Sequence, residues 1–420
     1  MTSFFGSGRQ PGVSAITAAG WLWSSVRPIA QCWVVVAAIA YAVDLLPQIR
    51  DGLSDGSGRA LGDDFLNCWS AALLAFQGRA AEVYDFVAFH AYETSVVGSH
   101  IGFYHYSYSP VLLLLSLPLA FISYVPALGI WLFTTWLGFY RALLLSGADG
   151  VLLLSIATPA LFVNALLGQN GALTAALLGG GLLLIDRRPI VAGALLGLLA
   201  FKPHLALMLP VALIAGRRWR TVGAAAAMVV LLVSVSAVIF GIDCWTLYGR
   251  NLAILRMLIL EDGTGVWHRM VSVFVFAKRL GAGAGLAYVL QAASALLASC
   301  FVFRSWFRDD PAHLRLAMVV VGNWLATPYL QDYDLVVGAF VVVWLRTAER
   351  CSPAWIPHIR SATVAILLLP IAAGLFGKAT GLAAGPIVIV PLFVLLNCLA
   401  AEVRRGTAPC GVEAALKGAF

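Results

Sequence analysis

Long apolar runs separated by short polar segments make up most of the chain. The first run, residues 28–46, can cross a bilayer, because about 20 apolar helical residues span a hydrocarbon core roughly 30 Å thick. It lacks a small-residue cleavage site, so we interpret it as a retained anchor rather than a signal peptide. Further runs cover residues 110–123, 126–144, 150–166, 171–186, 189–201, 204–216, 221–240, 284–303, 313–327, 333–346, 361–376 and 382–400. The pattern predicts an all-α fold, a polytopic transmembrane helical bundle that occupies residues 1–420 as one domain.

Basic residues between the runs predict the orientation. Cytoplasmic loops are enriched in Lys and Arg, so we expect the arginine clusters and both termini on the cytoplasmic side. The runs give an odd number of crossings, which would separate the termini. We therefore expect about twelve spans and one re-entrant or surface segment, for which 110–123, interrupted by Pro110 and Pro118, is the candidate. The clusters are Arg9 and Arg27, Arg187 and Arg188, Arg217 to Arg220, Arg304 and Arg308, Arg346 to Arg360, and Arg404 and Arg405.

Composition excludes an ordinary soluble domain. The chain is 61% hydrophobic and 11% charged, with a mean hydropathy of +0.90, whereas soluble domains carry about 25% charged residues. The net charge of +7 lies in clusters between apolar runs, so we expect membrane lipids and no nucleic acid as partners.

Two outer loops follow from this topology, residues 47–109 and 241–283. The first contains Asp63 and Asp64, directly before apolar residues that recur at helical spacing over 65–77. This predicts a helix lying on the membrane surface. Asp64 is suited to cap that helix, or it can act as a general base at the water–lipid boundary, with Asp63 as the neighbouring alternative. The second loop predicts a surface helix over 270–280.

Basic candidates for binding a phosphate fall on the same outer side. Lys202 and His204 flank a proline that keeps both near the surface; a snorkelling lysine and a helix-end histidine are the structural alternative. His268 and Arg269 lie in the second loop, where Arg can make bidentate contacts with phosphate.

Candidates for binding a sugar or an acceptor also fall there. Trp267 can stack on a sugar or lie in the interfacial aromatic belt. Asp332 and Asp334, two residues apart, can bind sugar hydroxyls or a metal, or cap the next helix. Gln169 and Asn170 form either a plain turn or a hydroxyl-binding edge. Polar groups at a membrane edge are costly and often functional, so their shared side favours one site.

Several segments in order resemble one enzyme family. They are "DFLNCWSAALLAFQGRAAEVYD", "YSPVLLLLSLPLAFI", "LLGQNGALTAALL", "AGALLGLLAFKPHLALMLPVALIAGRRWR", "FGIDCW" and "TPYLQDYDL", spread over roughly residues 60–345. Together they resemble glycosyltransferase family 87, the polyprenyl-phosphate-mannose-dependent group of the C-type glycosyltransferase superfamily. Asp64 matches the family's catalytic Asp best, and Asp63 is second. Cys68-Trp69 and Tyr108-Ser109-Pro110 depart from the family's Tyr-rich positions and "YPP".

The resemblance implies a hexosyltransferase with its active site on the outer face. It would transfer a sugar, mannose in the family, from a polyprenyl-phosphate donor to a hydroxyl of a glycolipid or polysaccharide, with inversion. Its distribution implies a bacterial inner membrane and a periplasmic active site. We expect no cofactor and no metal, because a single phosphate diester has little need of one. The alternative is a transporter or flippase of a lipid-linked sugar, although we detect no matching halves.

Overall fold

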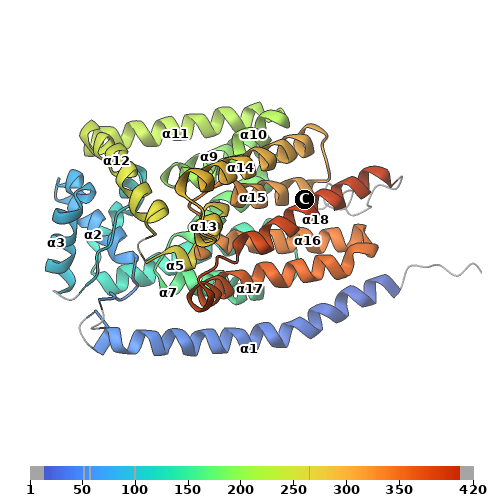
Figure 1. The fold of residues 1–420 in the computed structure, drawn as a ribbon, viewed down its shortest axis with the longest axis horizontal. Helices are drawn as coiled ribbons and strands as arrows, with labels where there is room; N and C mark the ends of the chain where they lie inside the picture. Colours follow the sequence, from blue (N-terminus) through green and yellow to red (C-terminus); the bar gives the residue numbers. More distant parts are fainter. Residues whose placement is uncertain (1–13, 51–52, 56–57, 99–100, 264, 407–420) are drawn as a thin grey trace, which may run out of the picture.

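The structure, a computed structural model, describes residues 14–50, 53–55, 58–98, 101–263 and 265–406. Its long helices run roughly parallel to one another and form a bundle (Figure 1). In the described part of the chain there are isolated bridges but no extended strands, so the predicted all-α polytopic fold is confirmed. The α-helices are α1 Ser14–Arg50, α2 Phe65–Phe76, α3 Phe86–Val97, α4 Pro110–Ser116, α5 Tyr124–Leu144, α6 Val151–Ala157, α7 Pro159–Leu166, α8 Gly171–Leu184, α9 Pro189–Gly197, α10 Met208–Ala215, α11 Trp219–Phe240, α12 Ile242–Leu255, α13 Val273–Arg279, α14 Ala284–Phe307, α15 Ala312–Ala326, α16 Gly338–Cys351, α17 Ile356–Thr380 and α18 Gly385–Arg405.

Helices of two lengths build the bundle. Within the described residues, six helical segments are long and apolar enough to cross a membrane: Arg27–Gln48, Tyr124–Leu144, Trp219–Phe240, Ala284–Phe307, Pro353–Thr380 and Gly385–Arg405. Several other predicted runs are shorter or broken. The run 150–166 divides into α6 and α7 at Pro159, and 189–216 divides into α9 and α10 around Pro203. Proline lacks a backbone N–H, so a helix often breaks there.

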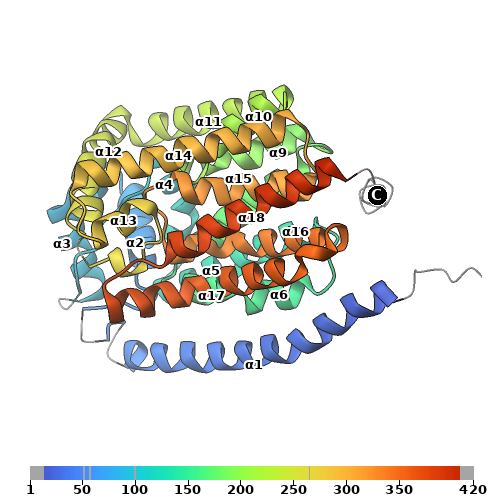
Figure 2. The same ribbon diagram turned by 45° about the vertical axis from the view of Figure 1, so that its right-hand side comes forward.

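The first helix lies apart from the other long helices. α1 runs along one side of the bundle and contacts mainly α6 and α7 (Figures 1 and 2). Most of its described side chains are exposed, as expected for a helix that faces lipid along much of its length. Its start and the end of α18 lie at the same end of the bundle, as expected for termini on one side of the membrane.

The segment 110–123 enters and leaves the bundle at one end. It forms α4 and a short 3₁₀ helix, η2 (Leu117–Phe121). Tyr108 before it donates a hydrogen bond to Gln169, and Tyr124 after it donates one to the carbonyl of Leu61. Leu61 precedes Asp64 by three residues, and Gln169 donates a hydrogen bond to Asp64. The segment therefore starts and ends near Asp64, as expected for a re-entrant segment.

We call the end that holds Asp63 and Asp64 the carboxylate end, and the opposite end the arginine end. α2, α3 and α12 gather at the carboxylate end, on the left of Figure 1. The helices α5, α8 and α16 each begin near the carboxylate end and finish at the arginine end. The bundle therefore has two chemically distinct ends joined by the same helices.

The predicted surface helix after Asp64 is wrong in one respect. α2 forms where expected, but ten of its twelve residues are buried. A 3₁₀ helix, η1 (Ala80–Tyr84), together with α3 and η2, packs against it. Trp69 donates its indole N–H to the carbonyl of Ile122, 3.0 Å away. α2 is apolar on nearly every side, so later parts of the same loop, together with η2, cover the face that we assigned to lipid. In the second loop, α13 forms within the expected 270–280.

Candidate functional site

The two adjacent aspartates lie in a tight turn before α2. Asp63 adopts a left-handed backbone conformation, with a φ of 46°, and follows Gly62 at 71°. The amide of Phe65 closes the turn on the carbonyl of Gly62, 2.9 Å away. The side chain of Asp64 makes no capping hydrogen bond to the first turn of α2. The capping alternative therefore fails for Asp64, and its carboxylate is available for other contacts.

Asp64 is held by Gln169 from the connection between α7 and α8. Gln169 Nε2 donates to Asp64 Oδ2 over 2.7 Å, and Tyr108 donates to Gln169 Oε1 over 2.8 Å. Gly168 is required here, because any Cβ would collide with Phe65 and the Gly62 carbonyl. Asp64 Oδ1 has no hydrogen-bond partner within the described residues. The result is a half-buried carboxylate with one oxygen fixed and the other open.

Asp63 has a different environment from Asp64. Its carboxylate lies 3.6 Å from Arg59, which also pairs with Asp44 near the end of α1. Burial, and next the charge of Asp64, raise the pKa of Asp63 to about 7, against the opposing effects of Tyr104 and Arg59. Near neutral pH the two aspartates therefore do not both carry a full negative charge.

Lys202 occupies a closed, buried pair. Its Nζ lies 2.5 Å from Asp334 Oδ1 and 3.1 Å from Asn170 Oδ1, and the Lys202 side chain is 4% exposed. The ring of Tyr333 lies beneath the same ammonium, with its centroid 4.6 Å away. Asp334 also accepts from the Gln331 amide over 3.2 Å, so it caps the 3₁₀ helix η7 (Asp332–Val337) as predicted. The Lys202 ammonium therefore donates two hydrogen bonds within the protein, and the Asp334 carboxylate offsets its charge.

Arg269 forms the second pair, also next to the Tyr333 ring. Its Nη2 lies 3.0 Å from Asp332 Oδ1, and its Nε lies 3.1 Å from Asp332 Oδ2. The guanidinium carbon lies 5.5 Å from the Tyr333 ring centroid. Arg269 Nη1 makes no hydrogen bond within the described residues. Arg269 therefore keeps one donor edge open. Its charge is a further effect that opposes the rise in the pKa of Asp63.

Burial favours the neutral form of both predicted histidines. Burial, followed by the charge of Lys202, lowers the pKa of His204 to about 3. Burial, followed by Lys378, also lowers the pKa of His268. His204 Nε2 has no hydrogen-bond partner among the described residues, and its ring lies near Tyr329, with centroids 5.9 Å apart. Either histidine can act as a hydrogen-bonding group but not as a fixed cation.

Trp267 is anchored within the second loop. Its indole N–H donates to the carbonyl of Ile259 over 3.0 Å, and Gly263 packs closely against the ring. Lys278 Nζ and Arg279 Cζ lie 5.6 and 5.8 Å from Trp267 ring centroids. Neither cation was predicted as a site residue, yet both lie next to one that was.

The structure thus brings most of the predicted site residues close together. Their roles in catalysis and binding stay predictions. One hydrogen-bonded chain contains Asp64, Gln169 and Tyr108, and the neighbouring pairs share Tyr333 between them. His204 and His268 border these pairs in sequence, and Trp267 belongs to the adjoining loop. Asp332 and Asp334 bind different cations rather than converging on a common point.

Sequence reasoning missed Glu93, on α3. Its side chain is fully buried, and neither carboxyl oxygen has a hydrogen-bond partner in the described part of the chain. Burial, and next the charge of Asp64, raise its pKa to about 9, so it is a neutral acid at pH 7. The signal was available: Glu93 follows Phe89 by four residues and precedes Val97 by four, so it falls on the apolar stripe of the helix.

Comparison with known proteins assigns the family. The sequence model of glycosyltransferase family 87 matches residues 106–328, more than half of the 420-residue chain. The match includes Tyr108, Gln169, Lys202 and Arg269 and begins after Asp64. No curated protein and no solved structure matches the chain. The protein is a multi-pass membrane glycosyltransferase, and the chain belongs to glycosyltransferase family 87.

Proposed function

We propose that the carboxylate end transfers a sugar, specifically mannose, from a polyprenyl-phosphate donor to a hydroxyl of a glycolipid or polysaccharide. Asp64 is the proposed general base. The observation that carries this assignment is its asymmetric setting: Gln169 fixes one oxygen, and the other has no partner within the described residues. A base must be oriented and must also leave a lone pair free for the proton that it accepts.

The proposed step is a direct displacement. The acceptor hydroxyl gives its proton to Asp64 Oδ1 while its oxygen bonds to the anomeric carbon. The bond from that carbon to the phosphate oxygen breaks, and the electron pair leaves with the polyprenyl phosphate. Attack from the opposite face inverts the anomeric centre, so a β-linked donor gives an α-linked product.

Arg269 is the strongest candidate partner for the departing phosphate. Asp334 and Asn170 engage Lys202, whereas Arg269 keeps Nη1 open beside the aspartates. A guanidinium edge that donates to a developing anion stabilises the transition state more than the ground state. Lys278 and Arg279, around Trp267, extend the positive surface next to Arg269.

The proposed location of this reaction is the outer face of a bacterial inner membrane. Two features support it: the carboxylate end lies opposite the start of α1 and the end of α18, and the arginine clusters from Arg187 to Arg405 lie at that other end, whereas Arg9 lies outside the described residues. A lipid-linked donor suits a site at a membrane edge, because its chain remains in the bilayer while its phosphate reaches the protein.

Transfer by the purified full-length protein tests the proposal. The protein in nanodiscs is given radiolabelled polyprenyl-phosphate mannose and a bacterial lipid extract, and labelled product is separated and its linkage determined. We expect Asp64→Ala to lower transfer on the order of 10²–10⁴-fold, as for loss of a general base. Asp243→Ala is the control, because Asp243 is an exposed carboxylate on α12 at the same end.

Three outcomes are distinguishable. Full transfer by Asp64→Ala removes the base assignment. Transfer of another sugar, but not mannose, keeps the mechanism and corrects the donor. Movement of labelled lipid across the bilayer without transfer, in protein that retains its thermal unfolding midpoint, supports the flippase alternative instead.

A further inference from the structure

The helix α1 carries a single acidic residue, Asp44, near the carboxylate end of the bundle. Asp44 lies in the apolar segment Arg27–Gln48, where an ionised side chain is costly unless it has a partner. Arg59, in the loop that follows α1, is that partner, and Gln48 Nε2 also donates to Asp44 over 3.3 Å. No other described side chain of α1 forms an ion pair with another segment. The first helix is therefore tied to the following loop through one carboxylate.

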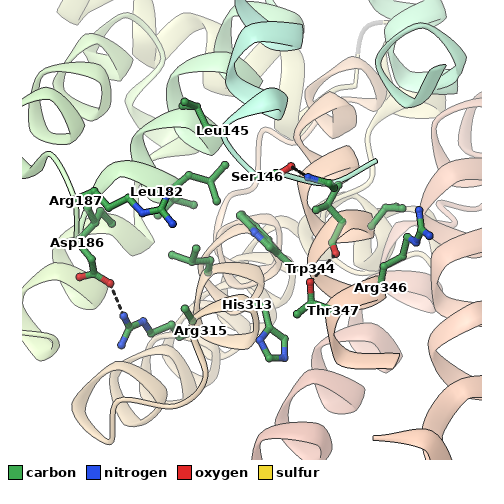
Figure 3. Close-up of a pocket in the computed structure, with 18 of the residues that line it drawn as sticks. Leu145, Ser146, Leu182, Asp186, Arg187, His313, Arg315, Trp344, Arg346 and Thr347 are labelled. Atoms are coloured by element: carbon green, nitrogen blue, oxygen red, sulfur yellow. Dashed lines mark hydrogen bonds and ion pairs between the residues drawn. The ribbon is translucent and has the colours of Figure 1, made fainter. Parts of the chain in front are cut away.

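Elsewhere α1 meets the bundle through apolar contacts. The ring of Trp33 packs against Phe162 on α7, with ring centroids 5.7 Å apart. A cavity of about 580 Å³ opens at the arginine end, between the α5–α6 connection, the end of α8, the α14–α15 connection and the end of α16 (Figure 3). None of the described residues of α1 lines it. The polar link between α1 and the rest of the protein thus lies beside the proposed active site.

Arg59 lies between α1 and the turn that carries the two aspartates. One edge of its guanidinium, Nη2, pairs with Asp44, whereas its Nε lies 3.6 Å from Asp63 Oδ2. The longer distance exceeds a hydrogen bond, and Nε has no hydrogen-bond partner within the described residues. The backbone amide of Arg59 donates to Asp55 over 3.1 Å, which fixes the start of the side chain. Arg59 is therefore engaged closely by Asp44 and only loosely by Asp63.

Both cations that face Asp63 are held by other acids. The charged and titratable groups around Asp63 are Asp64, Tyr104, Arg59 and Arg269. Asp332 holds Arg269 through two oxygens, and Asp44 holds Arg59. Asp63 therefore has no cation of its own to offset the adjacent charge of Asp64. This agrees with the raised pKa of Asp63, which burial and Asp64 cause.

We propose that α1 is a positioning element of the active site, in which Asp44 holds Arg59 back from Asp63 and so keeps the two adjacent aspartates from ionising together. Neighbouring carboxylates share a proton when nothing offsets their repulsion, and this separates their roles. Asp64 then acts as the base beside a neutral neighbour. Asp44 and Arg59 touch no reacting atoms. Only the consequence for transfer rests on the proposed function; the effect on Asp63 does not.

Infrared titration of the full-length protein measures the charge state of Asp63 without any substrate. The protein is held in a detergent that has no carbonyl group, and the stretching band of protonated carboxyl groups is followed against pH. The part of the band that is absent in Asp63→Asn belongs to Asp63. Its midpoint gives the pKa of Asp63, and the thermal unfolding midpoint shows that each variant is folded.

Two substitutions should move this midpoint in opposite directions. Asp44→Asn keeps the shape of the side chain but frees Arg59 to pair with Asp63, so the midpoint should fall by about half a pH unit or more. Arg59→Gln removes the cation, so the midpoint should rise by about one pH unit. Asp243→Asn is the control, because Asp243 is an exposed carboxylate on α12 at the same end, and it should leave the midpoint unchanged.

A double variant tests whether Asp44 acts through Arg59. In the Arg59→Gln background, Asp44→Asn should move the midpoint by less than half of its effect in the wild type. A full-sized shift there would mean that Asp44 acts on Asp63 directly, and it overturns the proposal. An unchanged midpoint in folded Asp44→Asn does so as well. If Asp44→Asn does not fold, Arg59→Gln decides: a midpoint that does not rise overturns the proposal.

Transfer provides a separate reading. The pH profile of kcat/KM should move in the same direction as the infrared midpoint in each variant. An infrared shift without a shift of this profile overturns the role of α1 in the reaction. If the wild type transfers no sugar, the proposed function fails, and the infrared midpoints still decide whether α1 sets the charge of Asp63.

Discussion

The two ends of the bundle contain the same residue types but use them differently. At the carboxylate end Lys202 and Arg269 each have their own buried acid: Lys202 and Asp334 are 4% and 0% exposed, and Asp332 is 5% exposed. At the arginine end Asp310 is also buried and pairs with Arg404, but Asp186 and Asp309 are 50% and 76% exposed and share Arg218 and Arg315. The ends therefore differ in how many of their ion pairs are exposed and shared.

The difference indicates where charge remains available to a substrate. Buried one-to-one pairs cancel their own charge and fix the backbone that carries them. At the carboxylate end Asp64 Oδ1 and Arg269 Nη1 are charged-group atoms that keep no hydrogen bond within the described residues. Such a site favours the placement of single atoms, as transfer chemistry requires. At the arginine end the cavity is lined by four arginines and four aspartates, so its charges largely balance one another.

Removing the buried lysine should have the largest effect on stability. We expect Lys202→Met to destabilise the protein by about 3–5 kcal/mol, because Asp334 would remain buried without its cation. Denaturant unfolding in detergent, followed by tryptophan fluorescence, measures the change.

The double variant Lys202→Met, Asp334→Leu separates pairing from packing. It removes both charges, so we expect it to recover at least half of the loss. A single variant that loses less than 1 kcal/mol would show that the pair is not closed to water, and the contrast between the ends would disappear.

Changing the geometry of the second pair should have a smaller effect. Arg269→Lys keeps the charge but cannot make the two parallel contacts with Asp332, so we expect a loss of about 1.5–3 kcal/mol. Transfer should fall further than stability predicts, because the open Nη1 edge is also lost. Arg250→Lys is the matched control, since Arg250 is an exposed arginine on α12 at the same end and forms no carboxylate pair within the described residues. Equal transfer by both variants would contradict a special role for Arg269.

The sequence predicts the general organisation of the bundle and which residues share an end. Hydropathy gives the apolar segments, and arginine clusters give their direction, which is enough to bring Gln169, Lys202 and Asp332 near Asp64. Which side chain pairs with which cannot be predicted from hydropathy and arginine clusters. Lys202 and Asp334 are 132 residues apart, and their contact depends on the rotation of each helix about its axis. The burial of α2 was missed because its cover combines η2 and α4, from the next apolar run, with η1 and α3, segments with no strong apolar period.

Glu93 provides a third case, a buried acid without a cation. Its pKa is raised to about 9, so between about pH 4.5 and 9 the folded protein keeps a proton that the unfolded chain releases. Stability from this group is therefore full at low pH and is lost as pH rises toward 9, by at most about 1.4 kcal/mol per pH unit. Glu93→Gln does not titrate, so its unfolding free energy should fall less steeply between pH 6 and 8. Parallel pH profiles for the two proteins would mean that Glu93 is already ionised at pH 6.

The smallest effect should come from an arginine at the open end. Arg218 is 32% exposed and pairs with Asp186, itself 50% exposed, so solvent screens the interaction. We expect Arg218→Ala to cost less than about 1 kcal/mol in the same unfolding measurement, and less still in 0.5 M NaCl. Asp186 keeps Arg315 as a partner after the substitution, so no buried charge is left alone. A loss of unfolding free energy as large as that of Lys202→Met would mean that the exposed ion pairs at the arginine end stabilise the fold as much as the buried pair does.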